Sequence, residues 1–399
     1  MRACVVNLGC KVNRVESDGF EALLAAAGCD LGSPQESDLI IVNTCTVTGE
    51  AEKKTRKAVR KALRQSADAP VLVTGCAAVI DPDEFADMDG RVVVVPKHQM
   101  VNAIQAYVDF DLADTSRTLA IPSRVRVGLK AQDGCDNACT FCIVHIARGP
   151  ARSVDASSLI KRACQLAAEG VSEIVLTGIN LGSYRASDGA DLALLLERLL
   201  AATASFQVRF RISSIEPQDV SDDLIALLAD ARGRVCRHLH LPLQAGSDRV
   251  LWEMARHYRA ADYEALVDRI RTRVPALSLT TDVIAGFPGE TEEDFQQTLA
   301  LAQRCAFSKM HVFPYSVRTG TPAATRRDQV PPDMRIARAR ALRQLSDELR
   351  RADRARRAGT HEMVVVEELG HGCTESYHEV AIDPRIPVGS MVEYCFGVQ

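Results

Sequence analysis

Three cysteines that are close together in the sequence, Cys135, Cys139 and Cys142, are the residues with the greatest capacity for chemistry. Thiolates at this spacing can ligate three irons of a cubane 4Fe-4S cluster and leave the fourth iron open. An open iron can bind a small molecule and pass an electron to it, so the triplet indicates redox chemistry and not only structure. The triplet therefore predicts a catalytic iron–sulfur cluster.

The triplet also has structural and redox interpretations that do not involve an iron–sulfur cluster. Buried thiols and a zinc knuckle are the structural alternatives, and a zinc site would require a fourth ligand nearby. A redox dithiol would use Cys139 and Cys142 alone, which leaves Cys135 without a role. Residues 124–130 alternate polar and apolar as a strand does, and turn residues follow at 132–134. The cysteines are therefore expected on a loop at the carboxyl end of a strand, where βα barrels build active sites.

A second set of cysteines, Cys10, Cys45 and Cys76, shows a repeated placement, because each follows a short apolar run. Helical patterns alternate with these runs, as in an α/β domain. The carboxyl ends of parallel strands share one sheet edge, so the three thiolates can converge there on one cluster. The alternative is that these cysteines are simply small buried residues of the core, because cysteine is often buried. The runs are residues 3–6, 39–43 and 71–74, and the helical patterns are residues 17–27 and 50–65.

The composition limits the class of protein and its compartment. The chain has 399 residues, of which 47% are hydrophobic, so it can bury a large core in about two or three domains. Its 13 cysteines, with no export signal at Met1, fit reduced thiols and metal ligation better than disulfides. No apolar run reaches the roughly 18 residues that a spanning helix requires. We therefore expect a cytoplasmic protein without a membrane partner.

A second α/β region is expected between residues 124 and 315. Six predicted strands alternate with amphipathic patterns, which is typical of a partial βα barrel; a complete barrel of eight units takes about 250 residues. The strands are predicted at residues 125–130, 173–177, 207–212, 237–241, 277–284 and 309–313, with helices at 157–168, 192–201, 219–228 and 292–304.

The last part of the chain is expected to add a long helix and a small β unit. Pro331 and Pro332 precede an arginine-rich helical pattern over about residues 334–358, and residues 363–367 and 390–396 are typical of short strands. The predicted fold class is therefore α/β with a short all-β end. The expected domains are residues 1–115, residues 121–359 and residues 360–399.

Four turns after the predicted barrel strands carry glycine or polar residues, as loops that pass close to a ligand do. Gly178, Glu216, Gln244 and Gly286 lie in the turns after the second, third, fourth and fifth strands. One glycine turn has little specificity, but four on one face of one barrel favour a ligand site. Glu216 is placed either to accept hydrogen bonds from a ribose or an ammonium group, or to cap a helix near Asp219.

Two helical patterns carry clustered positive charge, although the formal net charge of the chain is -4. Between Arg335 and Arg357 nine arginines stand against three acidic residues, a local balance of +6. Such clusters are typical of a phosphate-binding surface, and also of a solvated helix surface. The other cluster comprises Lys53, Lys54, Arg56, Lys57, Arg60, Lys61 and Arg64.

Taken together, these segments resemble the methylthiotransferase family of radical S-adenosylmethionine enzymes. The resemblance runs through nearly all of the chain, and it is most specific at residues 8–13, 42–47, 74–77 and 133–150. It implies an auxiliary 4Fe-4S cluster on the first-domain cysteines and a radical 4Fe-4S cluster on the barrel triplet. It also implies that residues 360–399 form a TRAM-like RNA-binding β unit, here truncated.

The resemblance further implies a site for S-adenosylmethionine at the open iron of the triplet cluster. Phe141, directly before the last cysteine, is typical of such enzymes. The turn at Gly178 would meet the methionyl amino group and the turn at Gly286 the adenine, with Glu216 and Gln244 as further contacts. The first of these turns departs from the Gly-Gly-Glu version that is widespread among radical enzymes.

The implied reaction begins with a 5′-deoxyadenosyl radical that removes hydrogen from C2 of a modified adenine. Sulfur from the auxiliary cluster joins that carbon, and a second S-adenosylmethionine supplies the methyl group. The electron would come from a donor such as flavodoxin or ferredoxin. An unpaired anticodon loop of tRNA lets the base leave its stack at low cost.

Residues 9–13 and 311–322 resemble the members that act on N6-threonylcarbamoyladenosine in tRNA. Sister groups act on isopentenyladenosine in tRNA or on an aspartate of a ribosomal protein, and both remain alternatives. A further alternative is an iron–sulfur protein that binds RNA or transfers electrons without radical chemistry. Two departures from the family pattern are His145, where proline is usual, and the 37 residues from Met363 to Gln399, which are few for an RNA-binding barrel.

Overall fold

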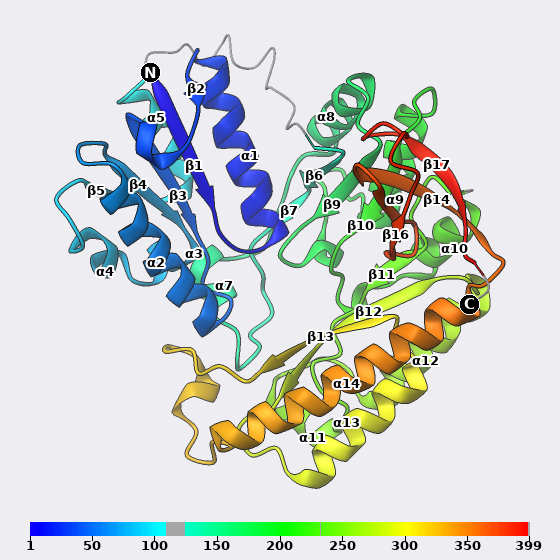
Figure 1. The fold of residues 1–399 in the computed structure, drawn as a ribbon. Helices are drawn as coiled ribbons and strands as arrows, with labels where there is room; N and C mark the ends of the chain where they lie inside the picture. The colour runs from blue at the N-terminus through cyan, green and yellow to red at the C-terminus, as the bar shows by residue number, and fades with distance from the viewer. Residues whose placement is uncertain (109–123, 232, 398–399) are drawn as a thin grey trace. The chain divides into compact units, whose positions relative to one another are not determined.

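The computed structural model describes residues 1–108, 124–231 and 233–397, and Figure 1 shows their helices and strands. Contacts divide the chain into two compact units. The first comprises the described part of Met1–Ser123 together with Cys142–Pro150, and the second comprises Arg124–Phe141 and the described part of Ala151–Gln399. No helix in the described ranges has both the length and the apolar character needed to cross a membrane.

The first unit is built on a parallel five-stranded sheet with the strand order β2-β1-β3-β4-β5. Its strands are β1 (Arg2–Asn7), β2 (Asp30–Leu31), β3 (Leu39–Thr44), β4 (Val71–Gly75) and β5 (Val92–Val94). Its helices are α1 (Lys11–Ala26), α2 (Gly49–Gln65), α3 (Cys76–Ile80), α4 (Pro82–Ala86), α5 (Met100–Gln105) and α7 (Val144–Arg148).

The central strands β3 and β4 have every residue buried. They carry nearly continuous apolar runs because a parallel strand inside a sheet is covered on both faces. One core cluster contains Ile40 and Val42 and the other contains Leu39 and Ile41, so alternate residues of β3 point to opposite layers. The predicted α/β order of this region is confirmed.

Helix α1 begins at Lys11, six residues earlier than the apolar pattern predicted. Residues 11–16 are mostly polar and give no apolar period, but Val12 and Asn13 are buried. Helix α2 begins close to the predicted residue, because Thr48 accepts a hydrogen bond from the amide of Ala51 at 3.1 Å.

The second unit contains the predicted partial barrel of six parallel strands. Two three-stranded sheets, β10-β9-β6 and β11-β12-β13, are joined by isolated bridges between Phe210 and Val235 and between Ser214 and His240. The strands are β6 (Arg126–Lys130), β9 (Glu173–Thr177), β10 (Arg209–Ile212), β11 (His238–His240), β12 (Ser278–Ala285) and β13 (Lys309–Pro314). A short antiparallel pair, β7 (Gln132–Asp133) and β8 (Arg152–Ser153), accompanies them.

The helices of this unit follow the strands in alternation. They are α8 (Ala156–Ala168), α9 (Leu192–Ala202), α10 (Asp222–Asp230), α11 (Asp248–Glu253), α12 (Ala260–Arg273), α13 (Glu292–Cys305) and α14 (Pro332–Arg356). Figure 1 shows α12, α13 and α14 side by side along one face of β12 and β13. Helix α10 begins at Asp222 and not at the predicted Asp219, because Ser221 caps it by accepting from the amide of Leu224 at 3.2 Å.

The arginines of α14 are largely used inside the second unit. Arg338 is buried and donates to Glu290 Oε1 at 2.8 Å, and Arg357, just after the helix, is buried and donates to Glu362 Oε1 at 2.8 Å. Arg335 donates to the carbonyl of Val330 at 2.7 Å. These contacts connect α14 to the barrel and to the last sheet.

The last segment forms an antiparallel sheet with the order β16-β15-β14-β17. The strands are β14 (His361–Glu368), β15 (His371–Thr374), β16 (Glu379–Ala381) and β17 (Met391–Cys395). The small β unit is thus confirmed, although the sequence pattern predicted only the segments of β14 and β17.

A buried ion cluster connects this last sheet to the barrel. Glu173 is fully buried and accepts from Arg209 at 2.8 Å and from Arg211 at 2.6 Å. The same guanidiniums donate to the carbonyls of Cys373 and Thr374, both at 2.9 Å. Burial alone would raise the pKa of the Glu173 carboxyl, but the arginines hold that pKa well below its usual range.

Candidate functional site

The cysteines of the first unit lie at the carboxyl ends of three adjacent parallel strands. Cys10 precedes α1 three residues after β1, Cys45 directly follows β3, and Cys76 opens α3 directly after β4. Strands β1 and β4 both pair with β3. The three cysteines therefore lie at one edge of the sheet, which is the placement that their spacing predicted.

Two glycines make this arrangement sterically possible. Gly9 has a φ of +108°, and a Cβ there would lie 2.6 Å from both Cβ and Sγ of Cys45. Gly75 has a φ of +100°, and a Cβ there would lie 2.4 Å from the backbone oxygen of Thr44. Only glycine fits such positions without displacing the neighbouring strand. Each Gly-Cys pair thus brings its cysteine close to the adjacent strand end.

The side chain of Asn13 holds the two loops of this edge together. Its amide nitrogen donates to the carbonyl of Leu8 at 2.9 Å and to that of Thr44 at 2.7 Å. Asn43 in turn donates to the carbonyl of Asn13 at 2.9 Å. The asparagines satisfy buried carbonyls that the ends of the strands leave unpaired, so the loops that carry the cysteines are fixed from both sides.

Arg148, on α7, places a positive charge against this cysteine set. Its Nε donates to Cys76 Sγ at 3.2 Å, and its Nη2 donates to Asn13 Oδ1 at 2.5 Å. Its Nη1 lies 2.9 Å from Glu16 Oε1, and 2% of the side chain is exposed. The positive guanidinium therefore lies beside a sulfur that would carry negative charge as an iron ligand.

The first cysteine set has the chemistry of an iron–sulfur site. Burial raises the pKa of the Cys45 thiol, a backbone hydrogen bond lowers it, and the neighbouring Cys10 and Cys76 raise it again. Negative charge on the neighbouring sulfurs thus opposes negative charge on Cys45, and a cationic cluster would remove that repulsion. Sulfur-only donors with a buried arginine beside them fit a 4Fe-4S cluster, which these three residues would hold.

The loop of the second cysteine set is held at its start by Gln132. Its side-chain amide donates to the carbonyl of Gly134 at 2.8 Å, and its oxygen accepts from the amide of Asn180 at 2.9 Å. A Cβ on Gly178 would lie 2.9 Å from that same oxygen. The glycine after β9 is therefore needed for the contact between its turn and the loop that leads to Cys135.

Cys139 is buried in the second unit and contacts a cation. Arg256 Nη1 donates to Cys139 Sγ at 3.3 Å. Burial raises the pKa of the Cys139 thiol, and Arg256 lowers it. The next residue of the loop, Thr140, is anchored because its hydroxyl donates to the carbonyl of Glu253 at 2.8 Å. A buried sulfur with an arginine donor fits the iron-ligating role predicted for the triplet.

The other members of this loop are less enclosed. Cys135 and Phe141 are half-buried in the second unit. Cys142 is half-buried in the first unit, where the amide of Val144 donates to its Sγ at 3.4 Å. Sulfur-only donors on a loop that follows a strand fit a 4Fe-4S cluster with S-adenosylmethionine at its open iron, and Cys135, Cys139 and Cys142 would hold it.

Arg256 also determines the environment of Glu216. Its Nη2 forms an ion pair with the Glu216 carboxylate, and its Nε donates to the Tyr258 hydroxyl at 3.2 Å. The helix predicted near Asp219 is α10, which Ser221 caps, and Glu216 makes no side-chain capping hydrogen bond to residues 217–219 either, so the capping alternative is wrong. Nothing in the sequence marked Arg256, and Arg148, although it lies within the motif at residues 133–150, was given no role there.

Gln244 and Gly286 occupy the ends of the paired turns after β11 and β12. Gln244 has a φ of +65° and forms an isolated β-bridge with Val283. Its backbone amide donates to the carbonyl of Asp282 at 2.9 Å. Gly286 has a φ of +75°, and a Cβ there would lie 2.5 Å from Cγ of Arg335. The Gly286 turn thus packs closely on α14, and its contact with an adenine stays a prediction.

Two family models match the chain. Residues 129–302 match the radical SAM superfamily, and residues 2–96 match the uncharacterized protein family UPF0004. The two matched ranges correspond to the barrel with its cysteine triplet and to the sheet with its three cysteines.

Three relatives cover most of the chain. The threonylcarbamoyladenosine tRNA methylthiotransferase MtaB of Bacillus subtilis is 39% identical over 86% of this chain and 79% of the relative. The protein of the same name from Thermotoga maritima is 34% identical over 91% of this chain and 86% of its own. The tRNA-2-methylthio-N(6)-dimethylallyladenosine synthase of Carboxydothermus hydrogenoformans is 35% identical over 86% of this chain and 82% of the relative.

A solved structure supports the fold. The radical S-adenosylmethionine methyltransferase TsrM from Kitasatospora setae, with cobalamin and a [4Fe-4S] cluster bound, matches with a TM-score of 0.58 and 16% identity. The match covers 81% of this chain and 77% of that one. At this identity the likeness shows the arrangement of strands and helices.

Proposed function

Because the chain belongs to the radical S-adenosylmethionine methylthiotransferase family, we propose that it adds a methylthio group to C2 of N6-threonylcarbamoyladenosine in tRNA. The target would be the adenosine at position 37 of the anticodon loop. The observation that carries the proposal is the presence of two cysteine sets, each with an arginine hydrogen-bonded to one of its sulfurs. One set serves hydrogen abstraction and the other serves sulfur transfer.

The chain's own residues would divide the work between two iron–sulfur clusters. When bound, the cluster on Cys135, Cys139 and Cys142 supplies the electron that cleaves S-adenosylmethionine to a carbon radical. Cys10, Cys45 and Cys76 would hold the cluster that carries the sulfur. The C2 hydrogen of an adenine is not acidic enough for a protein base, which is why a radical step is needed.

The environment of Cys139 supports the first of these roles. Arg256 joins the Cys139 sulfur to the Glu216 carboxylate, so the buried charges are paired in the absence of any ligand. Glu216 remains 16% exposed at its side chain. It can accept a hydrogen bond from a ribose hydroxyl or an ammonium group of S-adenosylmethionine beside its ion pair with Arg256.

The polar character of one barrel face supports the threonylcarbamoyl substrate. His240, Asp282 and His311 lie on three neighbouring strands with side chains on the same face. A polar face suits an adenine that carries a carboxylate and a hydroxyl, whereas an isopentenyl group would favour apolar contacts. The alternative isopentenyladenosine substrate remains relevant, because relatives that carry each name have similar identity to this chain.

The basic residues of α2 are suited to contact the phosphates of tRNA. Lys53, Lys57 and Lys61 are exposed, and so are Lys54, Arg60 and Arg64. Exposed cations in a row along one helix lower the free energy of binding to a phosphate backbone. An electron donor such as flavodoxin or ferredoxin would complete the system. The functional domains would be residues 1–115, 121–359 and 360–399.

Nucleoside analysis tests the function. A strain that lacks the gene is complemented with the wild-type protein or with a variant in which Cys135, Cys139 and Cys142 are alanine. We expect 2-methylthio-N6-threonylcarbamoyladenosine in hydrolysed tRNA only with the wild-type protein. Unchanged product in the deletion strain would exclude this substrate.

The same material distinguishes the alternatives. Loss of the methylthio group from isopentenyladenosine, or from a ribosomal aspartate, would identify one of the sister substrates. Absence of S-adenosylmethionine cleavage by the reduced, reconstituted protein would indicate a non-radical iron–sulfur protein.

A further inference from the structure

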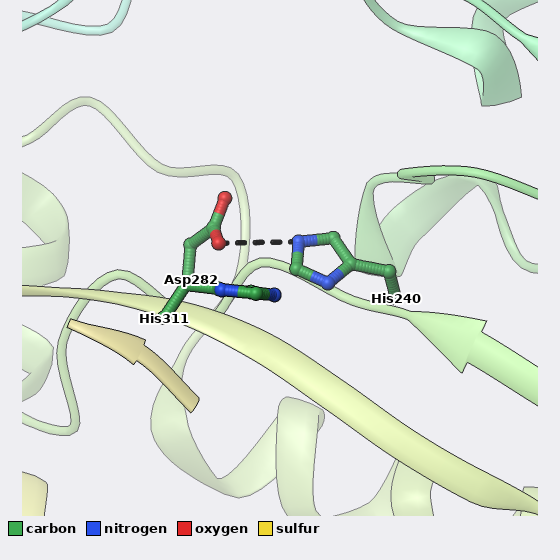
Figure 2. Close-up of side chains that lie close together, drawn as sticks. All are labelled: His240, Asp282 and His311. Carbon is green, nitrogen blue, oxygen red and sulfur yellow. Dashed lines mark ion pairs between the residues drawn. The ribbon is translucent and has the colours of Figure 1, made fainter. Parts of the chain in front are cut away.

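A group of three potential metal ligands lies on the barrel strands and contains no cysteine. His240, Asp282 and His311 each offer one ligand atom, and these atoms all lie within 4.8 Å of one another. Among the described residues this is the only group of three or more His, Cys, Asp or Glu side chains that is so close. Figure 2 shows the two rings and the carboxylate directed toward one another.

The strand register brings the three residues together. Asp282 of β12 is directly paired with His311 of β13. His240 of β11 is paired with Thr280, two residues before Asp282 and therefore on the same face of β12. Three side chains of one face, contributed by three neighbouring strands, form a rigid cluster because the backbone of each strand is fixed by its ladder.

One ligand separation already suits a first-row divalent cation, and the others are below 4.8 Å. His240 Nε2 lies 3.3 Å from Asp282 Oδ1. Two ligands at about 2.0–2.1 Å from a tetrahedral zinc ion are separated by ~3.3–3.4 Å, so this pair already has the spacing of one tetrahedral edge. The rings of His240 and His311 are tilted by 51° with centroids 5.6 Å apart, so they are not stacked on each other.

A neighbouring residue orients the first ligand. Thr280 Oγ1 lies 2.9 Å from His240 Nδ1 and also 2.9 Å from Nε2 of His238. When His240 donates from Nδ1 to this hydroxyl, the lone pair of Nε2 is directed at Asp282. Metal-binding histidines are usually held in this way, by a hydrogen bond at the ring nitrogen that does not bind the metal.

The site is partly open, which leaves positions for further ligands. The side chain of His240 is 13% exposed and that of Asp282 is 30% exposed. Two imidazoles and one carboxylate suit zinc, iron or manganese, and three protein ligands are the number found in sites that keep an open position. The donor set contains no sulfur, so it differs in kind from both cysteine sets.

From these contacts we propose that His240, Asp282 and His311 bind a divalent transition-metal cation of the zinc type, separate from the iron–sulfur clusters. The open positions would take oxygen ligands from water or from a bound molecule. The rival arrangement is a hydrogen bond from His240 Nε2 to Asp282 with no cation. Only the first arrangement predicts that the protein retains a bound cation after it has been exposed to the metal and desalted.

The test uses the reconstituted protein with both clusters in place, equilibrated anaerobically with zinc sulfate and then desalted. We expect one retained zinc per chain by mass spectrometry, with an unchanged iron count. Asp282→Asn preserves the size of the side chain but removes its charge, and His311→Ala removes one ligand. Each should weaken zinc binding by at least the roughly 10–100-fold that loss of an outer partner of a metal site costs.

The protein offers a matched control pair. His361 Nδ1 lies 3.3 Å from Glu393 Oε1, the same separation as in the proposed site, but on the exposed surface. That pair belongs to no group of three ligands among the described residues. His361→Ala should leave zinc retention unchanged.

X-ray absorption at the zinc edge distinguishes the site from stray binding to cysteine. Nitrogen and oxygen neighbours at about 2.0–2.1 Å support the proposal, and a sulfur shell at about 2.3 Å overturns it. No retained zinc in the wild-type protein, or equal retention in Asp282→Asn, also overturns it. The unchanged iron count in each variant shows that the protein has folded.

Discussion

Arg148 should raise the reduction potential of the cluster that we propose for Cys10, Cys45 and Cys76. Its guanidinium Nε lies 3.2 Å from Cys76 Sγ, and its side chain is 2% exposed. A positive charge stabilises the reduced cluster, which carries one more electron. We predict that Arg148→Gln lowers the potential, because glutamine is neutral.

The size of the shift follows from Coulomb's law. The added electron spreads over the cluster, so we take an effective charge separation of about 6 Å; at an effective dielectric constant of about 20 the attraction is ~2.8 kcal/mol. For a one-electron couple, about 59 mV corresponds to 1.4 kcal/mol, so the potential should fall by ~120 mV. Glu16 opposes this effect, because its carboxylate lies 2.9 Å from Arg148 Nη1 on the other end of the guanidinium.

A double variant separates the charge effect from a structural one. If we take an effective separation of about 9 Å for the Glu16 carboxylate, on the far side of the guanidinium, its repulsion of the added electron is ~1.8 kcal/mol at the same dielectric constant. Removal of both charges in Glu16→Gln with Arg148→Gln should therefore lower the potential by only ~40 mV. If Arg148→Gln instead acted by loosening the structure of the site, the reduction potential of the double variant would differ from that of the wild type at least as much as that of the single variant.

The assay is a redox titration followed by electron paramagnetic resonance. It is carried out in a background in which Cys135, Cys139 and Cys142 are alanine, so that only one cluster contributes to the signal. Arg198→Gln, which removes an arginine from the ion pair with Asp188 in the other unit, is the control. A shift below about 30 mV with a full iron count would refute this reasoning.

Two further predictions concern the framework. Gly9→Ala should lose the first-unit cluster, and so about half of the iron, because its Cβ would lie 2.6 Å from Cys45 Sγ; Gly19→Ala, where nothing lies within 4 Å, should keep all of it. Glu173→Gln should lower the free energy of unfolding at pH 7 by about 3–5 kcal/mol, because Arg209 and Arg211 lose their buried partner. The pKa of the Glu173 carboxyl is depressed in the folded state, so its contribution is present above the unfolded pKa of about 4.3 and is lost as the pH falls below it. Urea midpoints of the two proteins should thus converge on acidification, and a constant difference from pH 7 to pH 3 would contradict this origin.

The buried strands and the cysteine positions could be predicted because their signals are local. Residues 173–177 were predicted as a strand and form β9 with the same bounds. An apolar run between turn residues is sufficient for this, since a central parallel strand is buried on both faces. The placement of Cys45 and Cys76 directly after such runs needed no further information.

Other elements depend on contacts that no local pattern contains. Strand β15 has the sequence His-Gly-Cys-Thr and is held by antiparallel pairing with β14, where Val365 faces Cys373. Strand β16 has three residues, and among the strands that the structure describes it pairs with β15 alone. Such segments become strands because a neighbouring strand supplies their hydrogen bonds, and their own composition is nearly neutral.

The partners of the cysteine sulfurs were also beyond the reach of sequence patterns. Arg148 is 72 residues from Cys76, and Arg256 is 117 residues from Cys139. A single contact between distant residues leaves no periodic trace, so even Arg148, which lies within the motif at residues 133–150, could not be recognised from the sequence as a partner of Cys76. Their importance follows from burial and from the atoms that they contact.

The two basic helices show how burial changes the meaning of a charge pattern. By sequence, both α2 and α14 are clusters of cations. In α14, Arg338 is buried against Glu290, and Arg350 donates to the carbonyl of Ser308 at 3.3 Å, so much of its charge holds the barrel together. In α2, Lys57 and Lys61 are exposed. Removal of a buried arginine leaves its partner unpaired and costs stability, whereas removal of an exposed lysine changes mainly the attraction to an external phosphate. In α2, therefore, a larger part of the charge is available to a nucleic acid than in α14, where the arginines that remain exposed include Arg340 and Arg351.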